Sequence, residues 1–460
     1  MPQPNEIIVI GAGISGLSCA YRLKQLGISA TVFEVGDRPG GLVGTVEKDG
    51  FLFESGPQSF QGTNVLLDLI RALRLEGELL QANPRAPRYV LRNGALQQIP
   101  MSPQGLLVSS LLGVGSRWRL ASEPFRRTRP PSEEESVAAF VRRKFGHEIL
   151  EYLVSPFVSG VYAGDPEKLS LRAAFPSLDE WERQFGSVLR GAMKSRPKDQ
   201  PRKGPPPLCS FRRGLATFMR ALGDNLGEQL RLGVSVAAVN RTGQLGEEGY
   251  EVRFTRDGHP ETIRARGVVL ATPAYTASHL VRAMSADLAQ ALSGIAYAPV
   301  AVVAAGYYSH QFTQVPDGFG FLVPRSEKFH TLGTVWNSSL FPGRAPNDSV
   351  AMTSFLGGAT DPDMVAKTES EVAAVATEEN ARILGITGPP VSSQAWKYQR
   401  ALPQYNLGHG HLVGAVREAE RATPGLFFSG NYLEGPAIGK CVEQGFRTAE
   451  SVNAYLQRPL

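Results

Sequence analysis

Cysteine and histidine are scarce in this sequence, and their spacing excludes several kinds of site. The three cysteines of the 460-residue chain lie far apart, at positions 19, 209 and 441, and no C-x-x-C pair occurs. Neither a disulfide framework nor a thiolate metal site is expected, which fits a reducing compartment. Of the seven histidines, only His409 and His411 are close together. No acidic motif accompanies them, so we interpret both as polar loop residues and expect no metal.

Long apolar runs are also missing. No run reaches the roughly 18 residues that a membrane-spanning helix needs. A glycine-rich motif begins at residue 11, which leaves no room for a cleavable signal or transit peptide. The sequence therefore predicts a cytoplasmic protein.

Charge of one sign does not dominate. The net charge is +5 and the pI is near 9.0, which mildly favours anionic partners such as a carboxylated substrate or a membrane face. The basic residues are dispersed and no nucleic-acid-binding motif occurs, so we expect no nucleic acid partner. The length predicts two or three subdomains, and the 42% of hydrophobic residues is that of a globular protein.

What the chain does contain is a glycine-rich turn close to its N-terminus. Residues 6–16 read E-I-I-V-I-G-A-G-I-S-G, which is G-x-G-x-x-G on Gly11, Gly13 and Gly16. A second apolar run, 30–33, ends on Glu34, 18 residues beyond Gly16. A strand, a tight turn, a helix and a strand closed by an acid predict a dinucleotide-binding βαβ unit. Its pyrophosphate would lie at the helix N-terminus, and its ribose on the carboxylate.

The residues after Glu34 distinguish flavin from nicotinamide. The stretch 34–45, E-V-G-D-R-P-G-G-L-V-G-T, resembles the second cofactor motif of flavin amine oxidases. The glycine pair allows close backbone approach, and Arg38 can reach a phosphate. We therefore expect a flavin dinucleotide.

The remaining pattern predicts an α/β fold, with an α+β substrate part. Segment 63–75, with Asn64 as a cap, and segment 100–200, with a capping box at 132–135, read as helical. A proline-rich basic stretch, 195–208, predicts a solvated loop at a boundary. Buried strands at 267–273 and 426–430 return to the cofactor sheet, which makes a discontinuous Rossmann-like domain. Strands between 298 and 360 predict a second, largely antiparallel sheet.

Segment 105–129 leaves two interpretations open. A mostly apolar stretch, 105–114, is followed by Trp118, Phe125 and five arginines between 117 and 129. Such a pattern is typical of a helix that lies in the membrane interface. It also fits a core helix with a solvated basic end.

Four further motifs carry a resemblance to one family. They are G-N-Y-L-E-G-P-A-I-G-K-C-V-E-Q-G at 430–445, W-K at 396–397 followed by P-Q-Y-N-L-G-H at 403–409, G-F-G-F-L-V-P at 318–324, and S-G-V-Y-A-G-D at 159–165. Over nearly its whole length the chain resembles the oxygen-dependent protoporphyrinogen oxidases and their relatives, the coproporphyrinogen oxidases.

The resemblance implies a function and a domain layout. It implies non-covalent FAD and the six-electron oxidation of protoporphyrinogen IX in heme biosynthesis, in two-electron steps that reduce molecular oxygen to hydrogen peroxide. It implies an FAD-binding domain at 1–85, 205–275 and 420–460, a mostly helical membrane-binding domain at 86–204, and a substrate-binding domain at 276–419. Peripheral membrane association through residues 105–129 follows. Relatives are often dimers, which leaves a homodimer open.

The resemblance also implies the site residues. The substrate-binding positions are Arg88, which would pair with a propionate, the ring-sandwiching Phe319 and Leu322, the nearby Phe355, and the turn residue Gly160. The cofactor-binding positions are Gly11, Ala12, Gly13, Ile14, Ser15, Gly16, Glu34, Val35, Arg38, Leu42, Gly56, Pro57, Gln58, Val236, Trp396, Pro436, Ala437 and Ile438. We expect residues 435–438 to open the terminal helix, with Pro436 in its first turn. No side chain is assigned as acid or base.

Three alternatives remain. Coproporphyrinogen oxidases share every flavin motif, so coproporphyrinogen III is an alternative substrate. The chain could also be another flavin oxidoreductase, such as an amine oxidase or a carotenoid desaturase. Amine oxidases often attach the flavin to a cysteine, but Cys441 lies inside the motif shared by the porphyrin enzymes. A non-enzymatic flavin-binding protein is the third alternative.

Overall fold

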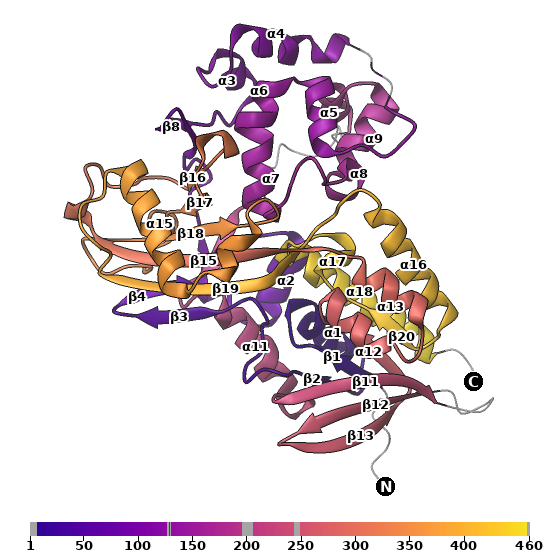
Figure 1. Cartoon of the computed structure of the whole chain (residues 1–460). Coiled ribbons are helices and arrows are strands. Elements are labelled where there is room, and N and C mark those ends of the chain that lie inside the picture. Colours follow the sequence, from indigo (N-terminus) through magenta and orange to yellow (C-terminus); the bar gives the residue numbers. More distant parts are fainter. Residues whose placement is uncertain (1–6, 127, 129, 196–205, 243–248, 458–460) are drawn as a thin grey trace.

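Three regions make up the molecule. The computed structural model describes residues 7–126, 128, 130–195, 206–242 and 249–457. Figure 1 shows a mostly helical region at the top, a broad sheet in the middle and a second sheet with covering helices below. The expected loop at 195–208 falls almost wholly on residues 196–205, outside the described residues, as do Arg127 and Arg129 of the expected basic cluster.

The lower region is built on a five-stranded parallel sheet, in the order β10-β2-β1-β14-β20. All residues of β1, β2, β14 and β20 are buried, because other elements cover both faces. The expected α/β fold with an interrupted Rossmann-like sheet is confirmed. The strands are β1 (Ile7–Ile10), β2 (Ala30–Phe33), β10 (Leu230–Arg231), β14 (Gly267–Leu270) and β20 (Leu426–Phe428).

Helices on one face of this sheet include α1, α2, α11 and α18, and the other face packs against α12, α13, α16 and a three-stranded antiparallel sheet, β11-β12-β13. The bounds are α1 (Ile14–Gln25), α2 (Asn64–Ala72), α11 (Ala216–Leu226), α12 (Ala274–Val281), α13 (Ala286–Ser293), α16 (His409–Ala422), α17 (Asn431–Glu434), α18 (Ile438–Leu456), β11 (Val234–Thr242), β12 (Gly249–Arg256) and β13 (His259–Ala265).

The middle region is a seven-stranded mixed sheet, in the order β19-β15-β18-β17-β16-β7-β8. All neighbouring pairs are antiparallel except β16 and β7. Helix α15 covers one face. The bounds are β7 (Arg88–Arg92), β8 (Ala95–Gln98), β15 (Tyr297–Tyr308), β16 (Gly320–Leu322), β17 (Thr331–Val335), β18 (Ser349–Gly357), β19 (Ser392–Pro403), α14 (Asn337–Leu340) and α15 (Glu369–Leu384).

Two small sheets join the lower and middle regions. They are the hairpin β3 (Thr45–Lys48) and β4 (Phe51–Glu54), and the sheet β5 (Phe60–Gln61), β9 (Leu208–Phe211) and β6 (Leu79–Gln81). The aromatic rings of Phe51 and Phe53 pack with Ala304 of β15. The hairpin therefore fixes the middle sheet to the cofactor side.

The described residues between 103 and 194 form the upper region, which consists mostly of short helices. Its elements are α3 (Pro103–Val108), α4 (Val114–Ser122), α5 (Val137–Lys144), α6 (His147–Ile149), a π-helical turn (Leu150–Val154), α7 (Ser155–Tyr162), α8 (Leu171–Ala174), α9 (Pro176–Phe185) and α10 (Val188–Lys194). No helix in the described part of the chain is both long and apolar enough to cross a bilayer.

A buried ion cluster holds α5 against α9. Lys144 Nζ lies 3.0 Å from Glu182 and 3.5 Å from Glu123, and all three side chains are almost fully buried. Arg143 also contacts Glu182, at 2.7 Å. Burial alone would raise the pKa of Glu182, but hydrogen bonds from Arg143, Thr128 and Lys144 outweigh it and lower the pKa to about 2.

Three expected helix starts need correction. Helix α2 is capped by Thr63 rather than Asn64. Helix α5 begins at Val137 and is capped by Ser136, whose Oγ accepts from Ala139 N, so the capping box at 132–135 is wrong. Helix α18 begins at Ile438 with Ala437 as its N-cap, which leaves Pro436 before the helix.

Candidate active site

The glycine-rich turn joins β1 to α1 at the carboxyl edge of the parallel sheet. Gly11 has φ +103°, and a Cβ on Gly16 would lie 1.9 Å from Gly11 O, so only glycine lets α1 pack against the turn. Gly13 is the N-cap of α1 and has no atom within 4 Å of an added Cβ. The turn thus leaves open space at a helix N-terminus, where backbone N–H groups favour an anion.

The neighbouring motif residues are held in place around that space. Ala12 and Ser15 are buried and Ile14 is half-buried. Glu34, directly after β2, accepts hydrogen bonds on Oε2 from Ala12 N at 2.7 Å and on Oε1 from Gly36 N at 2.9 Å. An ionised carboxylate can accept about four hydrogen bonds, so Glu34 keeps capacity for hydroxyl donors.

Strand β11 starts beside Glu34. Val234 N donates to Glu34 O at 2.8 Å, and Val236 follows two residues later, at a bulge. Val35 is 70% exposed. Residues that are distant in the sequence, 34–35 and 236, therefore meet at the same edge.

Arg38 fixes the second cofactor motif through backbone carbonyls. Its guanidinium donates to Val43 O at 2.8 Å and to Gly41 O at 3.1 Å. In the structure Arg38 therefore holds the loop that carries Leu42, and a contact with phosphate stays a prediction.

The turn after β4 packs closely against that loop. A Cβ on Gly56 would lie 2.2 Å from Leu42 O. Gln58 Nε2 donates to Gly56 O at 2.8 Å, and its Oε1 accepts from Asn337 Nδ2 at 2.7 Å. Asn337 Oδ1 in turn accepts from Thr353 Oγ1 at 2.9 Å. This buried chain ties the turn with Gly56, Pro57 and Gln58 to strand β18 of the middle sheet.

The N-terminus of α18 reaches the site from the far end of the chain. Helices α1 and α18 pack backbone to backbone, since a Cβ on Gly445 would lie 2.6 Å from Ser15 O. Ala437 and Pro436 are exposed or half-buried, whereas Ile438 is buried. Thr63 Oγ1 lies beside Gly439 and has no hydrogen-bond partner.

One row of directly opposed residues crosses five strands of the middle sheet. Cross-strand partners run Trp396–Val302–Phe355–Gly333–Leu322 across β19, β15, β18, β17 and β16. Directly opposed residues share a face, so these side chains line one surface, away from α15. Four strand spacings of about 4.8 Å give a row about 19 Å long.

This face is apolar but incompletely covered. Trp396, Phe355, Leu322, Phe319 and Val335 are all half-buried, although most of their strand neighbours are fully buried. A row of half-buried apolar side chains is typical of a binding site for a large apolar ligand.

Arg88 lies at the far end of that face. It is the first residue of β7 and pairs with Gly320, and its guanidinium carbon lies 4.9 Å from the ring centroid of Phe319. Partial burial lowers the pKa of Arg88. Gly160 lies inside helix α7 rather than in the expected turn. It faces Leu322, whose Cδ2 would lie 2.5 Å from a Cβ added there. The structure thus brings the five predicted substrate residues to one surface.

A buried carboxylate stands between the cofactor and substrate regions. Glu54, at the end of β4, accepts from Thr45 Oγ1 at 2.6 Å and from Leu215 N at 2.9 Å. Arg344 lies 3.7 Å away and is fully buried. Burial raises the pKa of Glu54 to about 7, opposed by Thr45, Arg344 and Leu215.

Cysteine and histidine side chains near the site are buried. Burial raises the pKa of the Cys441 thiol to about 11. His409 and His411 both lie in the first turn of α16, so their interpretation as loop residues is wrong. His409 Nε2 is 3.0 Å from Tyr432 O, and burial lowers the pKa of His409. Among the described residues no group of three His, Cys, Asp or Glu could hold a metal.

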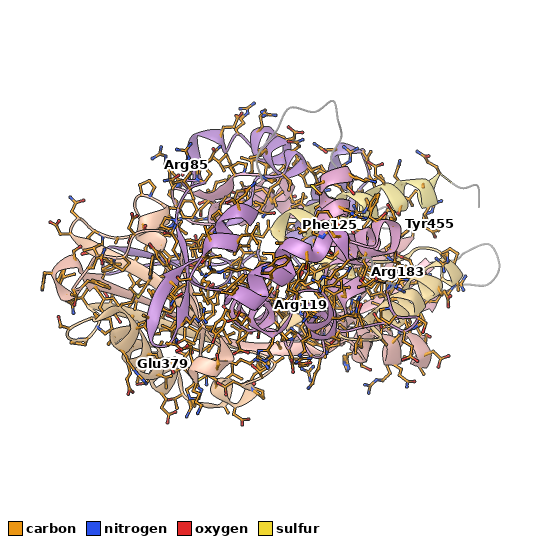
Figure 2. The ribbon with its side chains drawn as sticks, turned by 90° about the horizontal axis from the view of Figure 1, so that it is seen from above. Arg85, Arg119, Phe125, Arg183, Glu379 and Tyr455 are labelled. Carbon is orange, nitrogen blue, oxygen red and sulfur yellow. The ribbon has the colours of Figure 1, made fainter. Side chains whose placement is uncertain are left out.

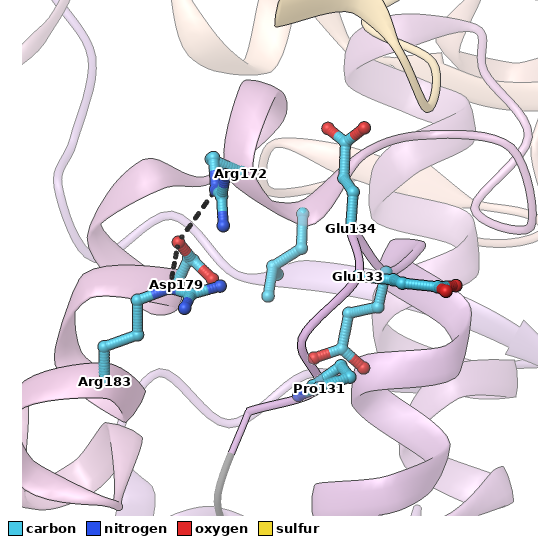
Figure 3. Close-up of a pocket in the computed structure, with 8 residues that line it drawn as sticks. Pro131, Glu133, Glu134, Arg172, Asp179 and Arg183 are labelled. Atoms are coloured by element: carbon cyan, nitrogen blue, oxygen red, sulfur yellow. Dashed lines mark hydrogen bonds and ion pairs between the residues drawn. The ribbon is translucent and has the colours of Figure 1, made fainter.

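A small pocket in the helical region has another character. Figure 3 shows Arg172, Asp179 and Arg183 on one side of this pocket and Glu133 and Glu134 on the other, and Asp179 pairs with both arginines. Its volume is about 10 Å³, which is space for about one water molecule. This pocket is therefore a polar junction between α8, α9 and the segment 131–135.

Comparison with known proteins identifies the family. The sequence pattern of the flavin containing amine oxidoreductases matches residues 14–453. The chain belongs to this family of flavin-containing amine oxidoreductases.

Within the family, the chain is similar to porphyrinogen oxidases. The chloroplastic protoporphyrinogen oxidase of Nicotiana tabacum is 34% identical over 475 residues, which cover 98% of this chain and 86% of the relative. The coproporphyrinogen III oxidase of Bacillus subtilis (strain 168) is 28% identical, and 98% of each chain is covered. The expected resemblance is confirmed.

A solved structure has the same fold. A crystal structure from Exiguobacterium sp. 255-15, provisionally titled a protoporphyrinogen oxidase, has a TM-score of 0.81 at 24% identity. It covers 99% of this chain and 100% of that one.

The residues of this flavin-family member fit a dinucleotide cofactor. Open space lies at Gly13, Glu34 keeps acceptor capacity, and Thr272 Oγ1, directly after β14, is buried without a hydrogen-bond partner. Thr272 N would lie 3.3 Å from a Cβ on Gly11, so the orphan hydroxyl belongs to the same edge. The expectation of FAD is supported by both family and geometry.

Sequence reasoning missed three residues that the structure places at this candidate site. Val335 lies two residues beyond Gly333 on β17 and therefore on the same face; the alternation of that strand could have identified it. Tyr398 donates from its hydroxyl to Ser55 O at 3.0 Å. Asn337 bridges Gln58 and Thr353. No local signal marks the last two, because their partners are distant in sequence.

Proposed function

We propose that this flavoprotein oxidises protoporphyrinogen IX to protoporphyrin IX in heme biosynthesis, with oxygen as the electron acceptor. The observation that carries the proposal is the half-buried apolar row from Trp396 to Leu322, which begins beside the cofactor edge and ends beside Arg88. A tetrapyrrole with propionates needs a long apolar surface with a cation at one end.

FAD would be held by backbone and carboxylate groups at the sheet edge. The N-terminus of α1 at Gly13 suits the pyrophosphate, Glu34 the ribose, and Val35 and Val236 the adenine side. The loops with Leu42 and Gly56–Gln58, together with Trp396 and residues 436–438, would hold the ring system. When bound, FAD would accept one hydride, which carries two electrons, in each oxidation step, and oxygen would then take these electrons from it.

The chain's own residues bind and orient the substrate. Phe319, Leu322, Phe355 and Val335 exclude water from one face of the macrocycle, and Arg88 pairs with a propionate. We assign no side-chain acid or base, so pyrrole N–H protons would leave through water or backbone groups. These residues therefore contribute to catalysis mainly by holding the substrate close to the flavin and by excluding water.

The direct test is aerobic turnover. Purified protein with bound FAD is mixed with protoporphyrinogen IX, and porphyrin fluorescence and hydrogen peroxide are followed together. Three equivalents of peroxide per porphyrin correspond to six electrons. A flavin-loaded protein that produces neither would contradict the proposal.

Coproporphyrinogen III is the second candidate substrate. The similarity to coproporphyrinogen III oxidases also extends over 98% of this chain. Comparison of kcat/KM for the two porphyrinogens on the same preparation decides between them. A ratio above about ten in either direction, or about 1.4 kcal/mol of transition-state binding, would assign the substrate.

We also propose a peripheral membrane surface on the helical region. Val108, Val114, Trp118 and Phe125 are between 73% and 82% exposed. Figure 2 shows Phe125 and Arg119 on the face seen from above. Apolar side chains next to arginines suit the lipid interface.

The membrane surface is tested by sedimentation with vesicles. The wild-type protein should bind vesicles that contain anionic lipid, and Trp118→Ser combined with Phe125→Ser should reduce binding at least about tenfold while turnover in detergent is kept. If the double variant sedimented with vesicles as the wild type does, the proposed membrane surface would be contradicted.

The remaining proposals concern location and assembly. We propose a cytoplasmic protein bound to the membrane peripherally, with an FAD domain at 1–85, 205–275 and 420–460, a membrane-binding domain at 86–204 and a substrate domain at 276–419. Strands β7 and β8 extend from the second of these segments into the substrate sheet. Light scattering would distinguish a monomer from a homodimer.

A further inference from the structure

A second cavity lies outside the row of substrate residues. It has a volume of about 540 Å³ and lies between α12, the segment after α13, and the end of β19. Small-molecule sites have volumes of about 300–1,000 Å³. None of the predicted cofactor or substrate residues lines this cavity.

Its lining is cationic. His279 comes from α12, Arg282 follows the last residue of that helix, and Arg400 comes from β19; no carboxylate is among the lining residues. Within the described ranges neither Arg282 nor Arg400 forms an ion pair, and both are exposed. Guanidinium groups without a carboxylate partner recognise carboxylates and phosphates.

Aromatic rings hold one of the arginines in position. The guanidinium carbon of Arg400 lies 4.8 Å from the ring centroid of Tyr275, and Tyr275 packs edge-on against Tyr297, with ring centroids 5.0 Å apart. The Tyr297 hydroxyl accepts from Ala274 N at 2.9 Å. The exposed guanidinium of Arg400 is therefore positioned by a fixed pair of rings.

The size and charge select the ligand. A single inorganic ion would fill only a small part of this volume, whereas an organic ring system with anionic substituents would use both the space and the arginines. The cavity also lies near the active site. Tyr297 in its lining accepts from Ala274 N, two residues beyond Thr272 at the carboxyl edge, and Arg400 lies four residues, about 13 Å, beyond Trp396 on β19.

We propose that this cavity is a second binding site, for a planar ring system that carries at least two anionic groups held by Arg282 and Arg400. Two sources have this chemistry, the carboxylates of a tetrapyrrole and the phosphates of a nucleotide. The tetrapyrrole is favoured if the proposed function holds, since its product is a planar polycarboxylate formed at the adjacent site.

The test uses the flavin-loaded, full-length protein and two probes, coproporphyrin III and ADP. The variants are Arg282→Ala with Arg400→Ala, Arg88→Ala, and Arg220→Ala on α11 as a matched control with an exposed arginine. Wild type should bind coproporphyrin at two sites. The double variant should lose at least about tenfold in affinity at one site only, Arg88→Ala should weaken the other, and Arg220→Ala should change neither.

The outcomes separate the sources and the proposals. If the double variant binds ADP more weakly than wild type but binds coproporphyrin unchanged, the site is supported and its ligand is a nucleotide. If neither probe binds, or both bind the double variant as they bind wild type, the site is overturned. Arg282→Lys with Arg400→Lys should recover part of the affinity, which a general loss of folding would not allow. Failure of the proposed function would instead appear as absent porphyrinogen turnover with this binding intact.

Discussion

The cofactor edge and the substrate face of this flavoprotein are built in different ways. The cofactor edge consists of backbone turns in which a glycine is fixed by contacts of a few ångströms, such as Gly16 against Gly11 and Gly56 against Leu42. The substrate face is a row of side chains from five strands, brought together by sheet register. The difference teaches that substitutions at the edge should act on folding and cofactor retention, whereas those on the face should act on substrate affinity.

The largest expected effect separates two glycines of one turn. Gly16→Val would place a Cβ 1.9 Å from Gly11 O, and backbone cannot yield as a side chain can. We expect a loss of more than about 3 kcal/mol in the free energy of unfolding, with protein isolated without flavin. Flavin absorbance per chain and urea unfolding measure both.

Gly13→Ala is the matched control for this prediction. Its Cβ meets no protein atom within 4 Å, so the apoprotein should keep its stability within about 0.5 kcal/mol. The methyl group would occupy space needed by the pyrophosphate, and flavin affinity should fall about tenfold or more. If Gly16→Val and Gly13→Ala were equally stable, the two glycines would not differ as proposed, one packed against protein backbone and the other facing the ligand.

The junction between the two regions should be pH-dependent through Glu54. Its folded pKa of about 7 lies above the ordinary value of 4.5, so its contribution to stability is complete below pH 4.5 and is lost as the pH rises through 7. The stability lost between pH 4.5 and values above 7 is in total at most about 3 kcal/mol. Glu54→Gln should flatten the dependence between pH 5 and 8, measured by urea unfolding of the apoprotein.

Glu182 provides the comparison of opposite sign. Its folded pKa of about 2 lies below 4.5, so its contribution is present above pH 4.5 and is lost as the pH falls toward 2. Glu182→Gln should therefore leave the slope between pH 5 and 8 unchanged while lowering stability overall. The assignment of the pH dependence to Glu54 would be contradicted if the slope of stability against pH disappeared in Glu182→Gln but persisted in Glu54→Gln.

The same division explains what the sequence could predict. The cofactor edge is encoded by contiguous patterns, so the turn at Gly11–Gly16 and the acid Glu34 follow from spacing alone. The five substrate positions came from a resemblance, because register between distant strands cannot be derived from local pattern. Neither local pattern nor resemblance identified Asn337 and Tyr398, because their partners Gln58 and Ser55 are about 280 and 340 residues away. The positions of helix caps were wrong by one to four residues because several adjacent residues compete to cap.

Arg88→Ala tests the face at its charged end. Loss of a charge-assisted pair with a carboxylate costs about 1.5–3 kcal/mol, so KM should rise between about tenfold and a hundredfold while kcat stays within about twofold. Arg85→Ala, at an exposed position three residues earlier, should change neither. A collapse of single-turnover flavin reduction in Arg88→Ala at saturating substrate would contradict a role limited to binding.

The smallest expected effect lies where the face is closed by α7. A Cβ on Gly160 would lie 2.5 Å from Leu322 Cδ2, but that atom is the end of a flexible side chain and can turn away. Gly160→Ala should therefore keep the flavin and the unfolding midpoint, while the displaced Leu322 narrows the space for substrate and raises KM about threefold to tenfold, or about 0.7–1.4 kcal/mol. Gly160→Ala combined with Leu322→Ala should restore part of the affinity, because the smaller side chain makes room for the methyl group. Loss of flavin in Gly160→Ala would instead mean that this part of the face supports the cofactor edge, and the two regions would not be separable there.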